Sequence, residues 1–208
     1  ISALMDVLAV IHGESVRSGV FGDVVRARGH ALEEWSLAWG TPLPRPLDAY
    51  GAVLVFGGAM HADQDQHHPW LREENFFLQR LLDLHTPVLG ICLGAQLLAK
   101  AAHAPVFPVD EAEVGWFEVE LTDAGADDPI LGRLPRTFDA FQWHYYAHGV
   151  PAGAVELACH MLHPPGLERA VEAAAGTALV RVRLPVLAAI LIALSAVISL
   201  VALEMIYK

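Results

Sequence analysis

The chain has 208 residues, which is enough for one domain with a sizeable core and a short appendage. Its formal net charge of −11 argues against a general nucleic-acid binder, because such a protein needs a basic surface that displaces counterions from phosphate. Only two cysteines occur, Cys92 and Cys159, so we expect no disulfide framework and a protein of the reducing cytoplasm.

The first half of the chain alternates between strand-like and helix-like segments. Apolar runs of strand length occur at residues 5–11, 52–56 and 87–89, and residues 31–37 could form a second strand. Helical spacing of apolar residues occurs at 18–29, 70–84 and 95–102. This alternation predicts an α/β fold with a doubly wound, mostly parallel sheet and helices on both faces. After residue 102 the pattern changes to strands, which we expect at 106–109, 114–121, 137–144 and 154–158.

The most specific motif is Gly90-Ile91-Cys92-Leu93-Gly94, which lies between a strand-like run and a helix-like stretch. A nucleophile on a sharp turn between a central strand and a helix is a nucleophile elbow. The start of the helix presents free N–H groups and the positive end of its dipole, which is expected to favour a thiolate. A cysteine in an apolar setting is usually a small buried side chain, but the two glycines and the strand–helix context favour a nucleophile that attacks a carbonyl.

The loop at 61–68 is rich in aspartate and histidine, which are residue types that bind metals. Its spacing matches no zinc or calcium pattern, so we expect no metal there and interpret the segment as a solvated loop at the rim of a pocket. Trp116, Trp143 and Phe141 are expected to be core residues more often than ligand contacts.

The elbow segment 90–99 resembles the nucleophile region of class I glutamine amidotransferases, and in particular the stand-alone group similar to the glutaminase domain of GMP synthase. This resemblance implies a flavodoxin-like fold for residues 1–158. The supporting segments occur in the family's order at 55–60, 68–71, 114–119, 141–144 and 151–158.

The resemblance implies a role for each matching residue. Cys92 would attack the side-chain amide carbon of glutamine, or of a γ-glutamyl amide, and release ammonia through a glutamyl thioester. The backbone N–H groups of Gly58 and Leu93 would form the oxyanion hole, and Gln96 would help to bind the substrate. No cofactor is implied, and an ammonia-accepting synthetase is the implied protein partner.

His144 has three interpretations. A histidine near the nucleophile could be its general base. In the family, however, the matching histidine lines the substrate pocket, which is the role that we favour here. The family usually continues with Gly-Asp, whereas this chain has Tyr145-Tyr146, so a purely structural histidine is the second interpretation.

The base half of the family's machinery is missing from these 208 residues. The family's catalytic histidine and acid belong to a later strand that reads Gly-x-Gln-Phe-His-Pro-Glu, and this chain has no His-Pro-Glu. A cysteine without a base and a group that orients the base lacks the relay that moves protons in acyl transfer. The sequence therefore predicts an amidotransferase-like hydrolase with impaired activity.

The resemblance ends near residue 158, where the composition changes. Residues 159–183 read as an atypical linker, and 184–203 carry no charge over a length that could cross a bilayer as a helix. Arg181 and Arg183 precede this apolar segment and would place the domain on the cytoplasmic side of a membrane. The competing interpretation is an out-of-frame translation, since a one-base shift at 161–166 permits a string similar to the family's.

Three functions therefore remain open. The first is a glutaminase-type hydrolase, and the second is a non-catalytic relic or binding module that keeps the fold. The third is a membrane-tethered interaction protein whose apolar segment is the functional part; a membrane is a partner only in that case.

Overall fold

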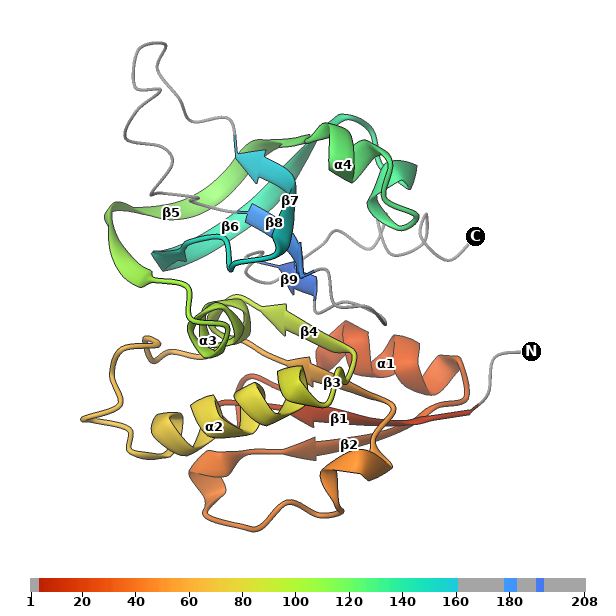
Figure 1. Cartoon of the computed structure of the whole chain (residues 1–208), viewed down its shortest axis with the longest axis vertical. Coiled ribbons are helices and arrows are strands. Elements are labelled where there is room, and N and C mark those ends of the chain that lie inside the picture. The colour runs from red at the N-terminus through yellow and green to blue at the C-terminus, as the bar shows by residue number, and fades with distance from the viewer. Residues whose placement is uncertain (1–3, 161–177, 183–189, 193–208) are drawn as a thin grey trace.

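The computed structural model describes residues 4–160, 178–182 and 190–192 (Figure 1). The helices are α1 (Gly19–Ala27), α2 (Trp70–Asp83), α3 (Leu93–Ala101) and the short α4 (Asp123–Ala126). The strands of the first half are β1 (Asp6–Val10), β2 (Ala31–Trp35), β3 (Ala52–Val55) and β4 (Val88–Ile91). Those of the second half are β5 (Val106–Leu121), β6 (Thr137–His148), β7 (Ala154–His160), β8 (Ala178–Val182) and β9 (Ile190–Ile192).

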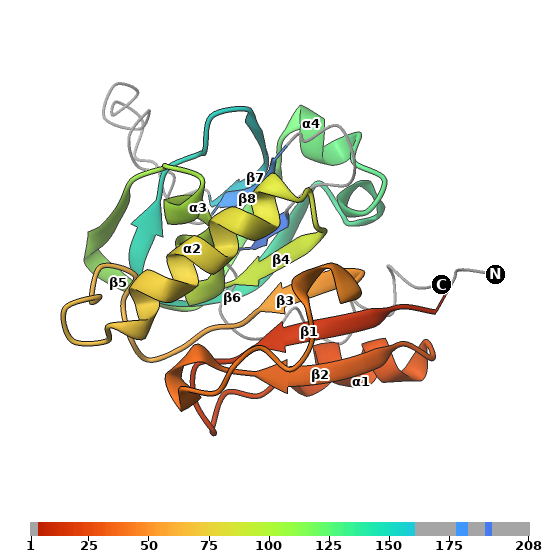
Figure 2. The ribbon, with the colours of Figure 1, turned by 60° about the horizontal axis from the view of Figure 1, so that its bottom comes forward.

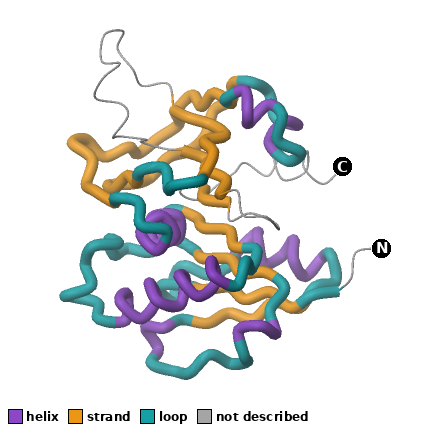
Figure 3. The backbone as a smooth tube through the Cα atoms, in the orientation of Figure 1, coloured by secondary structure: helices purple, strands orange, loops and turns teal. Residues whose placement is uncertain are grey.

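All nine described strands form one sheet in the order β2-β1-β3-β4-β9-β8-β7-β5-β6. The pairs from β2 to β9 are parallel, and the pairs from β9 to β6 are antiparallel. The parallel half is the doubly wound, flavodoxin-like part that the alternating sequence predicts, so the α/β fold class is confirmed. Long loops, which include the one between β3 and α2, leave this half at its edges (Figure 3).

The parallel strands are covered on both faces because their side chains alternate between two apolar cores. Leu8 and Val10 of β1 pack with Leu78 of α2 and Leu97 of α3. Ala9 of the same strand belongs to a second cluster, which also contains Ile11 and Phe56 and packs against Phe21 of α1. Figure 2 shows α1 and α2 on opposite sides of these strands.

Several element boundaries differ from the expectations. The two predicted strands at 106–109 and 114–121 are one strand, β5, whose pairing with β6 shifts register between Pro108 and Glu113. The expectation that Trp116 and Trp143 belong to the core is wrong, since 59% and 54% of their surfaces are exposed. Both residues lie on the β5–β6 hairpin at the edge of the sheet, where Trp116 is opposite Phe141 and Trp143 is opposite Val114.

The predicted linker and apolar segment contribute two strands to the sheet. Strand β8 lies in the linker at 159–183, and β9 lies in the apolar segment at 184–203 and pairs with β4. The rest of both segments, from 161 on, lies outside the described residues, so the membrane-helix and out-of-frame interpretations stay predictions. No helix in the described ranges is both long and apolar enough to cross a membrane.

Candidate active site

Three neighbouring parallel strands end at the same edge of the sheet and carry the candidate site. Strand β1 is followed by His12, β3 by Gly57-Gly58 and β4 by Cys92. Because β1, β3 and β4 are adjacent in the sheet, these residues meet at the carboxyl ends of the strands. Open α/β sheets bind ligands at this edge.

The predicted nucleophile elbow is present. Cys92 has φ 55° and ψ −116°, a left-handed backbone conformation that costs a non-glycine residue about 1–3 kcal/mol, and α3 begins at the next residue. A Cβ on Gly94 would lie 2.0 Å from the backbone oxygen of Val55, and one on Gly90 would lie 2.8 Å from the backbone nitrogen of Ala95. The two glycines are therefore required because β3, β4 and the first turn of α3 touch at the backbone.

The environment of the Cys92 sulfur differs from the expectation of a favoured thiolate. Burial raises the pKa of the Cys92 thiol, and the hydrogen bond from the Leu93 N–H lowers it by less, so the pKa lies above its ordinary value. The Cys92 thiol donates to the backbone oxygen of Trp143, 3.9 Å from the sulfur. In the part of the chain that the structure describes, no histidine or carboxylate is hydrogen-bonded to this sulfur. The hydrogen bond at the start of α3 lowers the pKa of the thiol, as predicted, but desolvation of the sulfur raises this pKa by more.

The two predicted oxyanion-hole residues lie beside each other. A Cβ on Gly58 would be 2.9 Å from Cδ2 of Leu93, and one on Gly57 would be 3.7 Å from the sulfur of Cys92. The Gly58 N–H donates no hydrogen bond to any described residue, and the Leu93 N–H points to the sulfur. The Leu93 N–H is thus at the cysteine, and Gly58, which packs against the Leu93 side chain, carries a second N–H near the elbow; backbone donors of this kind can bind an oxygen that develops negative charge.

Gln96 lies one turn into α3 and is almost completely buried, with 6% of its surface exposed. Its side-chain amide nitrogen donates to the backbone oxygen of Tyr146 at 3.1 Å, which ties α3 to β6. The glutamine is therefore held in a fixed orientation next to the elbow rather than solvated.

His144 is also buried, and its Nε2 lies 2.9 Å from Oε2 of Glu113, the residue opposite it on β5. No hydrogen bond links it to Cys92, although the preceding residue, Trp143, presents its backbone oxygen to the sulfur. This geometry favours a structural or pocket-lining histidine over a general base.

The loop at 61–68 is anchored rather than freely solvated. The rings of His61 and Tyr146 stack with their centroids 4.4 Å apart, and the Tyr146 hydroxyl donates to Oδ2 of Asp63 at 3.1 Å. Lys100 of α3 donates to the backbone oxygen of Ala62 at 2.7 Å. Among the described residues, no group of three or more histidine, cysteine, aspartate or glutamate side chains is arranged to hold a metal ion.

One feature of the site was not predicted from the sequence, a buried ion pair between His12 and Glu74. Nε2 of His12 is 2.8 Å from Oε1 of Glu74, and the two side chains are 1% and 0% exposed. Nδ1 of His12 lies 3.2 Å from the backbone oxygen of Gly57. A histidine directly after a strand that ends at the ligand-binding edge is the one signal that could have drawn attention to it.

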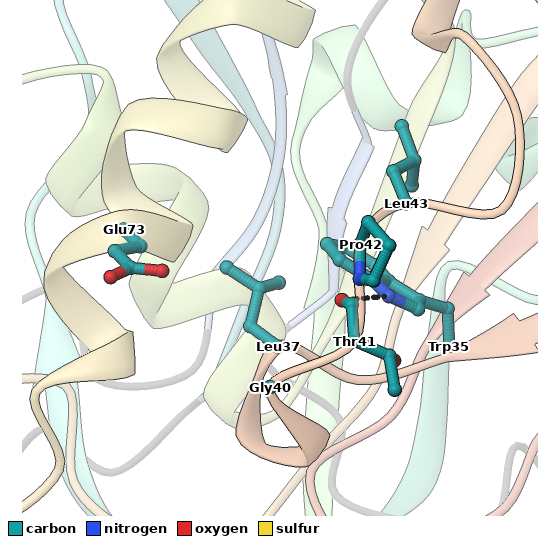
Figure 4. Close-up of a pocket in the computed structure, with 7 residues that line it drawn as sticks. All are labelled: Trp35, Leu37, Gly40, Thr41, Pro42, Leu43 and Glu73. Carbon is teal, nitrogen blue, oxygen red and sulfur yellow. Dashed lines mark hydrogen bonds between the residues drawn. The ribbon is translucent and has the colours of Figure 1, made fainter.

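The structure also contains a surface pocket of about 450 Å³ whose lining residues do not include any residue of the elbow. Figure 4 shows its residues, which are Trp35 at the end of β2, five residues of the segment that follows β2, and Glu73 of α2. The indole N–H of Trp35 donates to the backbone oxygen of Thr41 at 3.1 Å. It contains neither the cysteine nor the glycine pair.

The sequence matches the family "Glutamine amidotransferase class-I" over residues 9–163. It is 28% identical over 158 residues to the glutamine amidotransferase-like protein YfeJ of Salmonella typhimurium, which covers 74% of this chain and 66% of YfeJ. It is 31% identical over 122 residues to a γ-glutamyl-L-1-hydroxyisopropylamide hydrolase of a Pseudomonas species, covering 56% of this chain and 41% of that protein. Identity to the GMP synthase of Aeropyrum pernix is 33%, over 53% of this chain and 21% of the synthase. The chain thus spans less than two thirds of the length of each of these curated relatives.

The fold is similar to that of solved structures with related sequences. A glutamine amidotransferase from Thermotoga maritima superposes with a TM-score of 0.71 at 30% identity, covering 77% of this chain and 69% of that one. A glutamine amidotransferase from Methylobacillus flagellatus gives a TM-score of 0.69 at 27% identity, over 76% of this chain and 63% of its own. The sequence match, the fold and the relatives agree: this chain belongs to the class I glutamine amidotransferase family.

Proposed function

We propose that this chain is built to hydrolyse the side-chain amide of glutamine or of a γ-glutamyl amide, with Cys92 as the nucleophile. The sulfur would form a bond to the amide carbon, and the carbonyl oxygen would accept hydrogen bonds from the N–H groups of Gly58 and Leu93. The thiol proton would leave with the amine as the carbon–nitrogen bond breaks. Water would then hydrolyse the glutamyl thioester and regenerate the thiol.

One observation carries this proposal: a cysteine with φ 55° at the start of α3 has the Leu93 N–H at its sulfur and the Gly57-Gly58 pair, from the loop after β3, packed against the elbow. That arrangement suits a carbonyl that becomes an oxyanion, because the donors are already in place before the charge develops. The buried Gln96 and His144 lie on α3 and β6, the two elements next to the sulfur, and we assign them to the wall of the substrate pocket.

Turnover by the chain as it stands is expected to be slow. The 208 residues contain no His-Pro-Glu, and burial keeps the proton on the Cys92 thiol. A thiol without a neighbouring base is a poor nucleophile, since the thiolate is the reactive form. We therefore expect the chain to keep the residues that bind the substrate but to transfer protons poorly.

The names of the relatives suggest two substrate classes. One relative is named for the hydrolysis of a γ-glutamyl alkylamide, and the GMP synthases are named as glutamine-hydrolysing. If glutamine is the substrate, the released ammonia would pass to a separate synthetase partner. If a γ-glutamyl amide is the substrate, no acceptor is needed.

The test is to measure amine release from glutamine and from a γ-glutamyl alkylamide, with and without added imidazole, in the native chain and in Cys92→Ala. We expect a low rate that rises with imidazole concentration, because an external base can remove the thiol proton. Cys92→Ala should show no rise. Equal rates for the native chain and Cys92→Ala at every imidazole concentration would instead support the non-catalytic relic or binding module.

A further inference from the structure

The His12–Glu74 pair contacts the peptide bond that carries one of the two proposed oxyanion donors. The backbone oxygen of Gly57 and the N–H of Gly58 belong to the same peptide unit. The described residues contain no cis peptide bond, so in this planar trans unit the oxygen and the N–H point in opposite directions. His12 lies 3.2 Å from the oxygen and thereby fixes the direction of the N–H.

Gly58 packs against both His12 and the elbow. A Cβ on Gly58 would lie 2.8 Å from Cβ of His12 and 2.9 Å from Cδ2 of Leu93, so this glycine is in close contact with the histidine and with the first residue of α3. His12 itself is held by Glu74 of α2 and by Trp70, whose ring stacks on it with the centroids 5.8 Å apart. The histidine is therefore a fixed support and not a side chain that can follow the peptide.

The hydrogen-bond partners of His12 settle which nitrogen carries a proton. A backbone carbonyl can only accept, so Nδ1 must be the donor in the contact with Gly57. Nε2 faces a carboxylate oxygen of Glu74 at 2.8 Å, and the second carboxylate oxygen has no hydrogen-bond partner among the described residues. Both ring nitrogens are thus occupied, and His12 has no free nitrogen with which to take a proton from Cys92.

We propose that His12, held by Glu74, is a positioning residue that fixes the Gly57–Gly58 peptide so that the Gly58 N–H faces the carbonyl oxygen under attack. This inference rests on the proposed function, because it assigns a task to the oxyanion hole. The hydrogen bond at Gly57 also withdraws electron density from the shared peptide unit, which makes the Gly58 N–H a stronger donor. A peptide flanked by two glycines needs such a support, since glycine permits backbone rotations that other residues do not.

The experiment compares two reactions of the same sulfur. A chloroketone analogue of glutamine presents a carbonyl and needs the oxyanion hole, whereas iodoacetamide alkylates the sulfur without forming an oxyanion. The ratio of the two rates reports the hole and cancels changes in thiol reactivity. In His12→Leu we expect this ratio to fall by about 100-fold, the effect of removing one oxyanion donor. In His12→Asn, whose amide can still donate to Gly57, the ratio should stay close to that of the native chain.

His148 provides a matched control. It is also buried, and its Nδ1 lies 2.9 Å from a backbone oxygen, that of Gly149, the residue directly after β6. His148→Leu should lower stability without changing the ratio. If His12→Leu and His148→Leu lower stability alike and leave the ratio unchanged, His12 is only structural and the proposal is overturned.

A measurement on the native chain separates this proposal from the proposed function. Nitrogen NMR of the histidine rings should find Nδ1 of His12 protonated at neutral pH. An unprotonated Nδ1 could not donate to Gly57 and would overturn the positioning role of His12, even if all variants failed to fold. If Nδ1 is protonated but the chloroketone does not label Cys92 in the native chain, the hydrogen bond from His12 to the Gly57–Gly58 peptide stands and the proposed function fails.

Discussion

The ion pair between His12 and Glu74 gives a prediction for stability and its dependence on pH. The change is Glu74→Gln, which keeps the size of the side chain and removes its charge. The two side chains are 1% and 0% exposed, so solvent does not screen them, and breaking such a buried pair costs about 3–5 kcal/mol. Gln can keep one hydrogen bond to His12, so we expect the lower end of that range, about 3 kcal/mol.

The sign of the pH dependence follows from the pKa of His12. Burial lowers this pKa, but Glu74 and the Gly57 carbonyl raise it by more, so in the folded state it lies above the ordinary value of 6.5. A raised pKa means that folding takes up a proton. The extra stability is therefore fully present below about pH 6.5 and is lost as the pH rises through the folded pKa.

The assay is urea unfolding of the native chain and of Glu74→Gln at several pH values above and below pH 6.5. The difference in unfolding free energy between the two proteins should be largest at the acidic end and should shrink as the pH rises. A loss below 1 kcal/mol, or a difference that grows with pH, would refute the view that a charged pair stabilises this site.

The remaining predictions concern the elbow and the tail. Gly94→Ala places a Cβ 2.0 Å from the backbone oxygen of Val55 and should lower the unfolding free energy by about 3 kcal/mol in a denaturation experiment. In the control Gly13→Ala the new Cβ meets no atom within 4 Å, so the unfolding free energy should hardly change. Equal losses in the two variants would contradict the close backbone contact at the elbow. The rate at which iodoacetamide alkylates Cys92 should rise with pH, with a midpoint above that of an ordinary thiol, because burial raises the pKa of Cys92. A midpoint near neutrality would instead show a stabilised thiolate. If the residues after Ala158 are an out-of-frame translation, sequencing of the coding DNA should reveal a His-Pro-Glu strand in a shifted frame. The absence of such a strand would favour a genuine fusion to the apolar segment.

Most of the parallel half could be predicted because its signals are local. An apolar run such as 52–56, followed by two glycines, identifies a buried strand and its end without knowledge of its neighbours. The elbow could be predicted for the same reason, since strand, nucleophile and helix are consecutive. The expected helix at 70–84 matches α2 to within one residue.

The features that the sequence did not predict depend on distant pairings. Strand β9 pairs with β4, although about one hundred residues separate them, and its apolar residues look the same whether they enter a sheet or a bilayer. His12 and Glu74 are 62 residues apart, and neither sits in a recognisable motif. The raised pKa of Cys92 was also missed, because it arises from burial, whereas the sequence indicates only the helix start that opposes it.

The most direct test of the central claim is to treat the native chain with the chloroketone analogue of glutamine and to identify the modified residue by mass spectrometry. The account predicts one adduct, on Cys92, whose formation slows when glutamine or a γ-glutamyl amide is added. Cys159, the other free thiol, should remain unmodified under the same conditions. Modification of Cys159 in preference to Cys92, or labelling of Cys92 that neither compound slows, would contradict the claim that this elbow is a site for a γ-glutamyl carbonyl.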